Sequence, residues 1–249
     1  MAILSFVLGL VTGSFLNVCI YRIPREESVV YGHSRCPHCN TELGVKDLIP
    51  VMSYLLLKGR CRYCRESISI QYPLVELLTG VVFLLTYLAT GWHILLLKYW
   101  FLFSILIVIT FIDIKLLLIP NRLILMILNW WLLWQVLEPE ISWGQSLVGS
   151  LLGGGILLAI AVLSKGAMGG GDIKLMFAAG LMLGGPAVLL ALFISFVSGA
   201  LGGGFLLATG VKKLKEPIPF GPFLAVGIFV AALWGEELIQ LYLFLSGIR

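Results

Sequence analysis

Long apolar segments with few charges are the feature that most limits what this chain can fold into. The first of them, residues 2–21, contains no charged residue, and similar segments recur to the end of the chain. A helix of about 20 apolar residues crosses the hydrocarbon core of a bilayer. Of the 249 residues, 59% are hydrophobic and 12% are charged, whereas roughly a quarter of a soluble domain is charged. The sequence therefore predicts an all-α polytopic membrane protein.

We expect about eight transmembrane helices. Residues 2–21 lack a basic leading region, so this first helix should be retained in the membrane and not removed as a signal peptide. The other seven are expected at residues 73–90, 97–114, 122–137, 145–164, 172–184 and 187–210, and over most of the chain after residue 222.

Two Cys-x-x-Cys pairs lie in residues 22–72, the one long polar segment. They consist of Cys36, Cys39, Cys61 and Cys64, and 21 residues separate the pairs. This spacing is typical of zinc ribbons, in which four thiolates complete a tetrahedron. Two disulfides are an alternative, and so is a redox motif, although a redox motif needs only one pair. A closed four-sulfur site would be structural and would supply much of the folding free energy of so short a segment.

These segments predict three domains. Residues 1–21 form the first transmembrane helix, residues 22–72 a cytosolic zinc-binding domain, and residues 73–249 a seven-helix membrane core. Eight spans would place fifteen of the seventeen lysines and arginines on one side, Lys215 among them, and only Lys98 and Arg249 on the other. The positive-inside rule makes the first side cytosolic, so both termini face outward. A reducing cytosol also favours zinc over disulfides.

Two aspartates stand at the edges of apolar segments, each in the sequence Asp-Ile-Lys. Asp113 ends the third predicted helix, and Asp172 follows three glycines at the start of the sixth. Burying an uncompensated acid in a membrane is costly, so such residues are functional candidates. The eight-helix topology places both on the cytosolic side at similar depth. Each lysine follows its aspartate by two positions, roughly 200° around a helix, and should point away from it.

Two close carboxylates resist ionising together and tend to share a proton. The ionised one can take a proton from water while the protonated one polarises a scissile carbonyl. We therefore predict that Asp113 and Asp172 are the catalytic pair of an aspartyl peptidase. The simpler alternative is that each aspartate only caps a helix or pairs with a lysine. A different class, an ion- or proton-coupled transporter, would place its acids near mid-membrane and in repeated halves.

The chain resembles the type IV prepilin peptidases, also called prepilin leader peptidase/N-methyltransferases, over essentially its whole length. The matching stretches are GSFLNVCIYRIP, CPHC, LIPVMSYLLLKGRCRYC, QYPLVELLTG, DIKLLLIPNRL, AMGGGDIKL and PFGPFLAVG. The resemblance implies an integral Gly-x-Gly-Asp aspartyl peptidase of the bacterial inner or plasma membrane. It places the catalytic aspartates at Asp113 and Asp172 and the zinc ligands at Cys36, Cys39, Cys61 and Cys64.

The resemblance also implies the substrate. Such enzymes cut the short basic leader from prepilins and pseudopilins on the cytosolic side, typically after a glycine. A pilin precursor is itself an N-terminal hydrophobic helix with a charged leader left in the cytosol, so its cut site would lie near the predicted depth of both acids. The expected partners are therefore prepilin precursors and the lipid bilayer, with no nucleic acid.

Methyl transfer follows from the resemblance alone. Many members of the family methylate the new N-terminal amine with S-adenosylmethionine. No G-x-G-x-x-G follows a strand here, so no Rossmann-type cofactor site is visible. We expect methyl transfer near the cytosolic segment, with Asn17, Arg22 and Glu76 close by, and leave the cofactor-binding residues unassigned.

Overall fold

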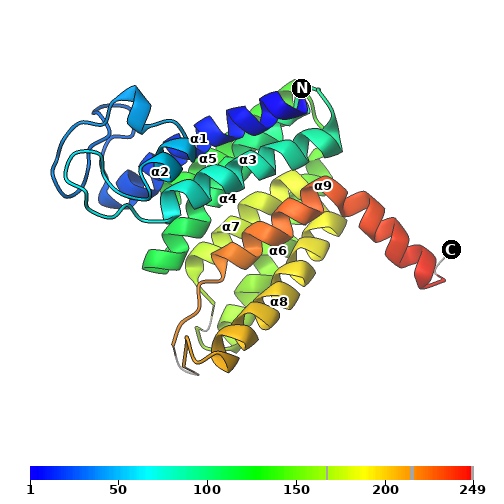
Figure 1. The fold of residues 1–249 in the computed structure, drawn as a ribbon. Coiled ribbons are helices and arrows are strands. Elements are labelled where there is room, and N and C mark those ends of the chain that lie inside the picture. The colour runs from blue at the N-terminus through cyan, green and yellow to red at the C-terminus, as the bar shows by residue number, and fades with distance from the viewer. Residues whose placement is uncertain (167, 214–215, 248–249) are drawn as a thin grey trace. The chain divides into compact units, whose positions relative to one another are not determined.

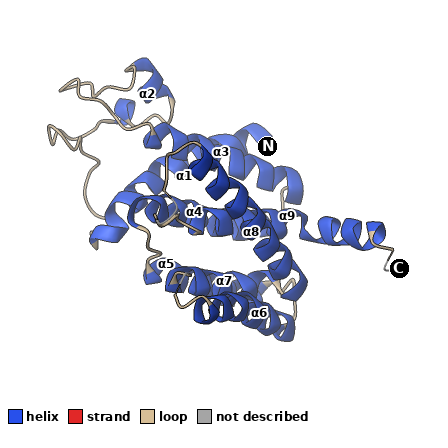
Figure 2. Ribbon diagram, turned by 90° about the horizontal axis from the view of Figure 1, so that it is seen from below, coloured by secondary structure: helices blue, strands red, loops and turns tan. Residues whose placement is uncertain are grey.

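The computed structural model describes residues 1–166, 168–213 and 216–247. The described residues form nine α-helices, two short 3-10 helices and two isolated β-bridges, with no extended strand (Figure 2). The α-helices are α1 (Ala2–Arg22), α2 (Met52–Leu56), α3 (Gln71–Thr90), α4 (Leu95–Leu116), α5 (Asn121–Leu137), α6 (Trp143–Leu163), α7 (Gly170–Leu183), α8 (Gly185–Ala208) and α9 (Gly221–Leu245). Lys215 and Arg249, which entered the charge count, lie outside the described residues.

The all-α polytopic class is confirmed. Six of the described helices are long and apolar enough to cross a membrane: α1, α3, α4, α6, α8 and α9. The other two predicted spans are also helices, but α5 has 17 residues and α7 has 14. At 1.5 Å per residue α7 is about 21 Å long, which is shorter than a hydrocarbon core of about 30 Å.

The chain divides into two compact units, residues Met1–Val108 and Ile109–Arg249. In the first unit α1 packs closely along α3, because small residues face α3. A Cβ atom at Gly13 would lie only 2.6 Å from the Cα atom of Glu76. The side-chain amide of Asn17 donates to the backbone oxygen of Tyr72 at 3.1 Å. Gly13 thus permits close packing of α1 on α3, and Asn17 makes a hydrogen bond between the two helices.

The segment between the two cysteine pairs contains little regular structure. Within residues 47–60 only α2 is α-helical, and it follows the 3-10 helix Val45–Asp47. Pro50 has no N–H to donate to a helix. Val51, Lys58 and Gly59 have φ values of 61°, 53° and 68°, which a right-handed helix does not allow. The backbone therefore turns at both ends of α2.

In the second unit α7 is the central helix, in contact with α5, α6, α8 and α9 (Figure 1). Its close fit to α6 depends on glycine. A Cβ atom at Gly153 would lie 2.6 Å from the backbone oxygen of Met176, and Gly149 meets Gly180 in the same way. Small residues at four-residue spacing therefore serve helix packing here. The helix α9 packs against α8 and kinks at Trp234.

Candidate functional site

A cavity of about 310 Å³ in the second unit contains both predicted catalytic aspartates. Asp113 reaches it from the last turn of α4, and Asp172 from the first turn of α7. Only 5% of Asp113 and 8% of Asp172 is exposed. The rest of the lining comes from the α4–α5 turn and the start of α7: Leu117, Leu118, Ile119, Asn121, Gly169, Gly170, Gly171 and Lys174. The structure thus brings two buried acids, 59 positions apart in the sequence, to one space.

The carboxylate of Asp113 is bound by the start of α9. The backbone N–H of Gly221, the first residue of α9, donates to Oδ2 of Asp113 at 2.9 Å. The N-terminus of a helix stabilises a negative charge, whereas the C-terminus of the aspartate's own helix α4 does not. The start of α9 therefore compensates for the unfavourable position of this carboxylate.

Asp172 is held within its own helix. It is the third residue of α7, and a carboxylate in the first turn of a helix is favoured by the helix dipole. Gly169, the residue before the helix, adjoins this carboxylate. The helix-capping alternative is therefore met at Asp113 by a hydrogen bond from α9 and at Asp172 by its place in the first turn of α7. Each carboxylate still has an oxygen to offer the cavity.

The three glycines before Asp172 are not equivalent. A Cβ atom at Gly169 would lie 2.8 Å from Oδ2 of Asp172, and one at Gly171 would lie 2.9 Å from the Cβ atom of Ile119. At Gly170 there is no atom within 4 Å. The outer two positions thus exclude a side chain for steric reasons, while the middle one is open. This is a physical basis for a Gly-x-Gly-Asp pattern.

The nearby lysine is turned away from Asp172. The ammonium of Lys174 donates to the side-chain oxygen of Asn121 at 3.0 Å. In the part of the chain that the structure describes, neither Asp113 nor Asp172 forms an ion pair. The two carboxylates interact electrostatically with each other and with backbone N–H groups. The alternative in which each acid pairs with a lysine is thus not what the described residues show.

The four cysteines of the first unit form a compact cluster. One sulfur atom from each of Cys36, Cys39, Cys61 and Cys64 lies within 4.8 Å of the others. The Sγ atoms of Cys36 and Cys64 are 3.8 Å apart. Tetrahedral zinc with Zn–S bonds of about 2.3 Å requires sulfur atoms about 3.8 Å apart. The arrangement fits a metal ion held by four thiolates.

The two halves of the cluster have the same local fold. The backbone N–H of Asn40 donates to the oxygen of Cys36 at 2.9 Å, and that of Arg65 donates to the oxygen of Cys61 at 3.1 Å. Asn40 and Arg65 both have positive φ values, 54° and 63°. Each cysteine pair therefore sits on the same tight turn. Two matching turns facing one another suit a shared metal better than a redox motif, which needs one pair.

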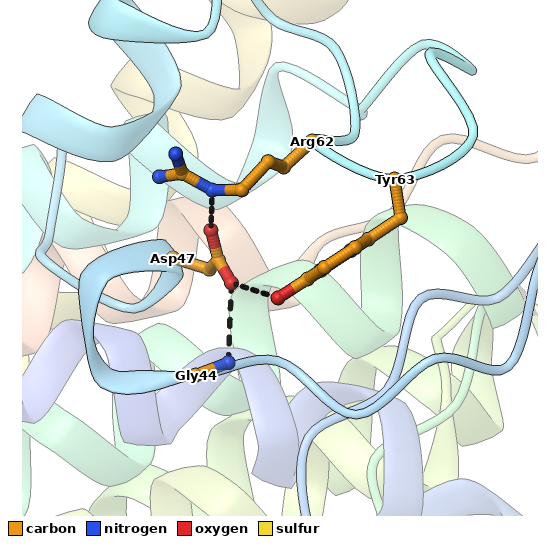
Figure 3. Close-up of polar contacts among 4 residues, drawn as sticks. All are labelled: Gly44, Asp47, Arg62 and Tyr63. Carbon is orange, nitrogen blue, oxygen red and sulfur yellow. Dashed lines mark hydrogen bonds and ion pairs between the residues drawn. The ribbon is translucent and has the colours of Figure 1, made fainter.

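The carboxylate of Asp47, in the segment between the two cysteine pairs, forms hydrogen bonds with the turn that carries Cys61 and Cys64 (Figure 3). Its carboxylate accepts from Nε of Arg62 at 2.6 Å, from the hydroxyl of Tyr63 at 3.1 Å and from the backbone N–H of Gly44 at 3.1 Å. The hydrogen bond from Arg62 holds the pKa of Asp47 below its usual range. Arg62 and Tyr63 are the two residues between Cys61 and Cys64, so this carboxylate orients one half of the cysteine cluster.

The residues expected near methyl transfer make structural contacts instead of lining an open site. Arg22 donates to the backbone oxygens of Ser28 and Tyr31 at 2.9 and 2.8 Å. Glu76 accepts the backbone N–H of Val51 at 2.7 Å and is 7% exposed. Asn17 is hydrogen-bonded to the backbone of α3, so all three side chains have backbone partners. The structure therefore does not identify a binding site for S-adenosylmethionine.

Sequence analysis assigned no role to Gly221 or Asn121. Gly221 lies in the Pro-Phe-Gly-Pro stretch, where a proline at the second position of α9 signals a helix start. That signal locates a helix N-terminus but not the acid that it binds. Asn121 begins α5 directly after Pro120, and only the fold shows that it contacts Lys174 at the rim of the cavity.

Comparisons with known proteins find relatives over nearly the whole chain. The family model described as "Bacterial Peptidase A24 N-terminal domain" matches residues 7–90, and "Type IV leader peptidase family" matches residues 100–204. A prepilin leader peptidase/N-methyltransferase of Bacillus subtilis (strain 168) is 36% identical over 238 residues, which cover 96% of both chains. Its counterpart in Aeromonas hydrophila is 37% identical over 96% of this chain and 93% of the relative. No solved structure matches the chain.

The helical membrane fold and the matched family models define the class: this is an enzyme, a type IV leader peptidase. More narrowly, the chain belongs to the prepilin leader peptidase/N-methyltransferase family. The same name is carried by a relative from Pseudomonas aeruginosa that is 31% identical over 98% of this chain. The transporter alternative finds no support in these matches.

Proposed function

We propose that this chain is a membrane aspartyl endopeptidase that removes the leader peptide of type IV prepilins or pseudopilins. Asp113 and Asp172 are its catalytic pair. One observation carries the proposal: both carboxylates are buried in one cavity of about 310 Å³, and neither has a cation as partner among the described residues. Two such acids share a proton, which gives one general base and one general acid.

The chemistry follows from that division of roles. The ionised aspartate takes a proton from water, and the water oxygen attacks the carbon of the scissile carbonyl. The protonated aspartate donates a hydrogen bond to the carbonyl oxygen as negative charge develops there. The tetrahedral intermediate then breaks its C–N bond, while the aspartate that took the proton from water passes it to the leaving amine. The backbone N–H of Gly221 fixes one oxygen of Asp113 and so sets the direction of that acid.

We propose that the cut is made on the cytosolic side of the bacterial inner or plasma membrane. The distribution of lysines and arginines supports this orientation, with both termini outside. A basic leader would be retained on that side. Residues 73–249 act as the peptidase core in this proposal, and residues 22–72 as a segment stabilised by a structural zinc ion on Cys36, Cys39, Cys61 and Cys64.

We further propose that the chain methylates the new N-terminal residue, as the names of its relatives indicate for them. S-adenosylmethionine, when bound, supplies the methyl group. The residues of this chain that bind the donor are left unassigned, because Asn17, Arg22 and Glu76 are bonded to backbone groups.

The test is a mass measurement on both products. Purified enzyme in liposomes is incubated with a prepilin, with and without S-adenosylmethionine. The proposal predicts loss of the leader in both samples and one added methyl group on the new N-terminus only when the donor is present. An intact precursor in both samples would reject the peptidase assignment. A cleaved but unmethylated product in the presence of the donor would reject methyl transfer alone.

A further inference from the structure

A second hollow in the second unit adjoins the aspartate cavity. It has a volume of about 540 Å³ and is bordered by α5, α6 and α7. Leu125 and Leu128 of α5, Leu151 and Leu158 of α6 and Phe177 of α7 give it an apolar wall. We call it the α5–α7 groove. Leu125, Leu151 and Leu158 are each more than half exposed, so the described chain leaves much of this apolar surface uncovered.

The groove is continuous with the aspartate cavity. Asn121 and Lys174 line both hollows, and the hydrogen bond between their side chains lies at the junction. The two acids lie on one side of this junction, together with Leu117, Leu118 and Ile119 of the α4–α5 turn. On the other side the lining beyond Asn121 and Lys174 is aliphatic and aromatic apart from two glycines. A molecule that occupied both hollows would need a polar segment followed directly by a hydrophobic one.

One position on the α6 side of the groove has no side chain. Gly155 lines it, is exposed, and has no atom within 4 Å of the position that a Cβ atom would take. Neither helix packing nor backbone conformation therefore requires glycine at this position. A larger residue would fit the fold but would fill the groove.

We propose that the α5–α7 groove binds the hydrophobic helix of the substrate, while the polar segment before that helix extends to Asp113 and Asp172. This inference rests on the proposed function and adds the surface that recognises the substrate. An amphipathic or apolar helix commonly binds by laying one face into an apolar groove. The continuity with the aspartate cavity distinguishes a prepilin-like chain from a lipid acyl chain, which has no polar peptide to place among the acids.

Filling the groove gives a direct test with a matched control. Gly155→Leu fills it, whereas Gly204→Leu adds the same side chain to α8 at another exposed glycine with no atom within 4 Å. Two substrates are compared: a complete prepilin, and a short peptide that carries the leader and cut site without the hydrophobic helix. The proposal predicts that Gly155→Leu lowers the ratio of kcat/KM for prepilin to kcat/KM for the peptide about tenfold, and that Gly204→Leu does not.

The ratio of the two kcat/KM values distinguishes failure of this proposal from failure of the peptidase assignment. If the wild type cleaves neither substrate, the proposed function fails, whatever the groove does. If Gly155→Leu cleaves prepilin with a wild-type ratio, or if both leucine variants lower the ratio equally, the groove is not the recognition surface.

A crosslinking measurement keeps the proposal testable if Gly155→Leu does not fold. A photoreactive residue replaces Leu158 in the groove or, as a control, the exposed Leu201 on α8. Both are placed in an Asp113→Asn background so that prepilin is not consumed. The proposal predicts crosslinks from position 158 to the hydrophobic helix of prepilin, and only lipid crosslinks from position 201. Lipid crosslinks alone from position 158 would show that the groove holds acyl chains and would overturn it.

Discussion

The backbone N–H of Gly221 donates to Oδ2 of Asp113 at 2.9 Å, across 108 positions of sequence. This bond joins the last turn of α4 to the first residue of α9 within one compact unit. A Cβ atom at Gly221 would lie 2.8 Å from Oδ2 and 3.2 Å from Cγ of Asp113. The glycine therefore both supplies the donor and leaves the space that the carboxylate occupies.

Gly221→Ala should displace the Asp113 carboxylate without removing it. A shift of about 1 Å in a reacting group can cost about a hundredfold in rate, so we expect prepilin cleavage to slow to a similar extent. Gly204→Ala on α8 is the control, because an added Cβ atom meets nothing within 4 Å there. Cleavage rate and thermal unfolding are measured for both variants. A Gly221→Ala enzyme that is folded and cuts at the control rate would show that this contact does not position the acid.

The glycine triplet offers a second matched comparison. Gly171→Ala places a Cβ atom 2.9 Å from that of Ile119, so the start of α7 must move away from the α4–α5 turn. Gly170→Ala meets no atom within 4 Å and replaces glycine by a better helix former. We expect the first variant to lose thermal stability and cleavage, and the second to match the wild type in both. Equal behaviour of the two variants would contradict the steric account of the Gly-x-Gly-Asp pattern.

Asp47→Asn should loosen the metal-binding cluster, because it weakens the bonds that orient Arg62 and Tyr63 between two of the cysteines. Loss of a residue that supports metal ligands commonly costs about tenfold in metal affinity. Zinc transfer from the intact protein to a coloured chelator measures the effect. Glu42→Gln is the control, since it breaks only the exposed Arg35–Glu42 ion pair. Equal zinc release from both variants would mean that Asp47 does not support the cluster.

The pH dependence of the difference in zinc release between wild type and Asp47→Asn is also predicted. The pKa of Asp47 is lowered in the folded protein by the Arg62 hydrogen bond. A lowered folded-state pKa gives stability that is present above the unfolded value of about 3.9 and is lost as pH falls through the folded value. The difference in zinc release between wild type and Asp47→Asn should therefore not vary with pH between neutrality and about pH 5. A difference that disappears within that range would show that Asp47 is protonated there.

Much of the fold could be predicted from sequence because a bilayer leaves few choices. Backbone polar groups in lipid must be satisfied within a helix, so each long apolar segment predicts one. The spacing of the four cysteines likewise predicted the cluster around which residues 36–64 are arranged. The glycines at 184 and 185 also predicted the end of the short helix at residues 172–184, which the structure has as α7, Gly170–Leu183.

The partners of the two aspartates could be predicted only in part. The Asp-Ile-Lys repeat and the preceding glycines drew attention to Asp113 and Asp172, since acids are costly in apolar sequence. The contact of Asp113 with Gly221 depends on how α4 and α9 pack, which no local pattern encodes. The turns at Val51 and Lys58, which limit α2 to residues Met52–Leu56, could not be predicted because valine and lysine rarely adopt positive φ.

The most direct test of the account is prepilin cleavage by Asp113→Asn and Asp172→Asn, assayed separately in liposomes beside the wild type. Each change keeps the size of the side chain and removes the acid. Zinc content and thermal unfolding show whether each variant is intact. The account predicts that both variants remain folded and zinc-loaded and that each loses cleavage essentially completely, because neither acid can do both parts of the reaction. Near wild-type cleavage by either folded variant would contradict the aspartate pair.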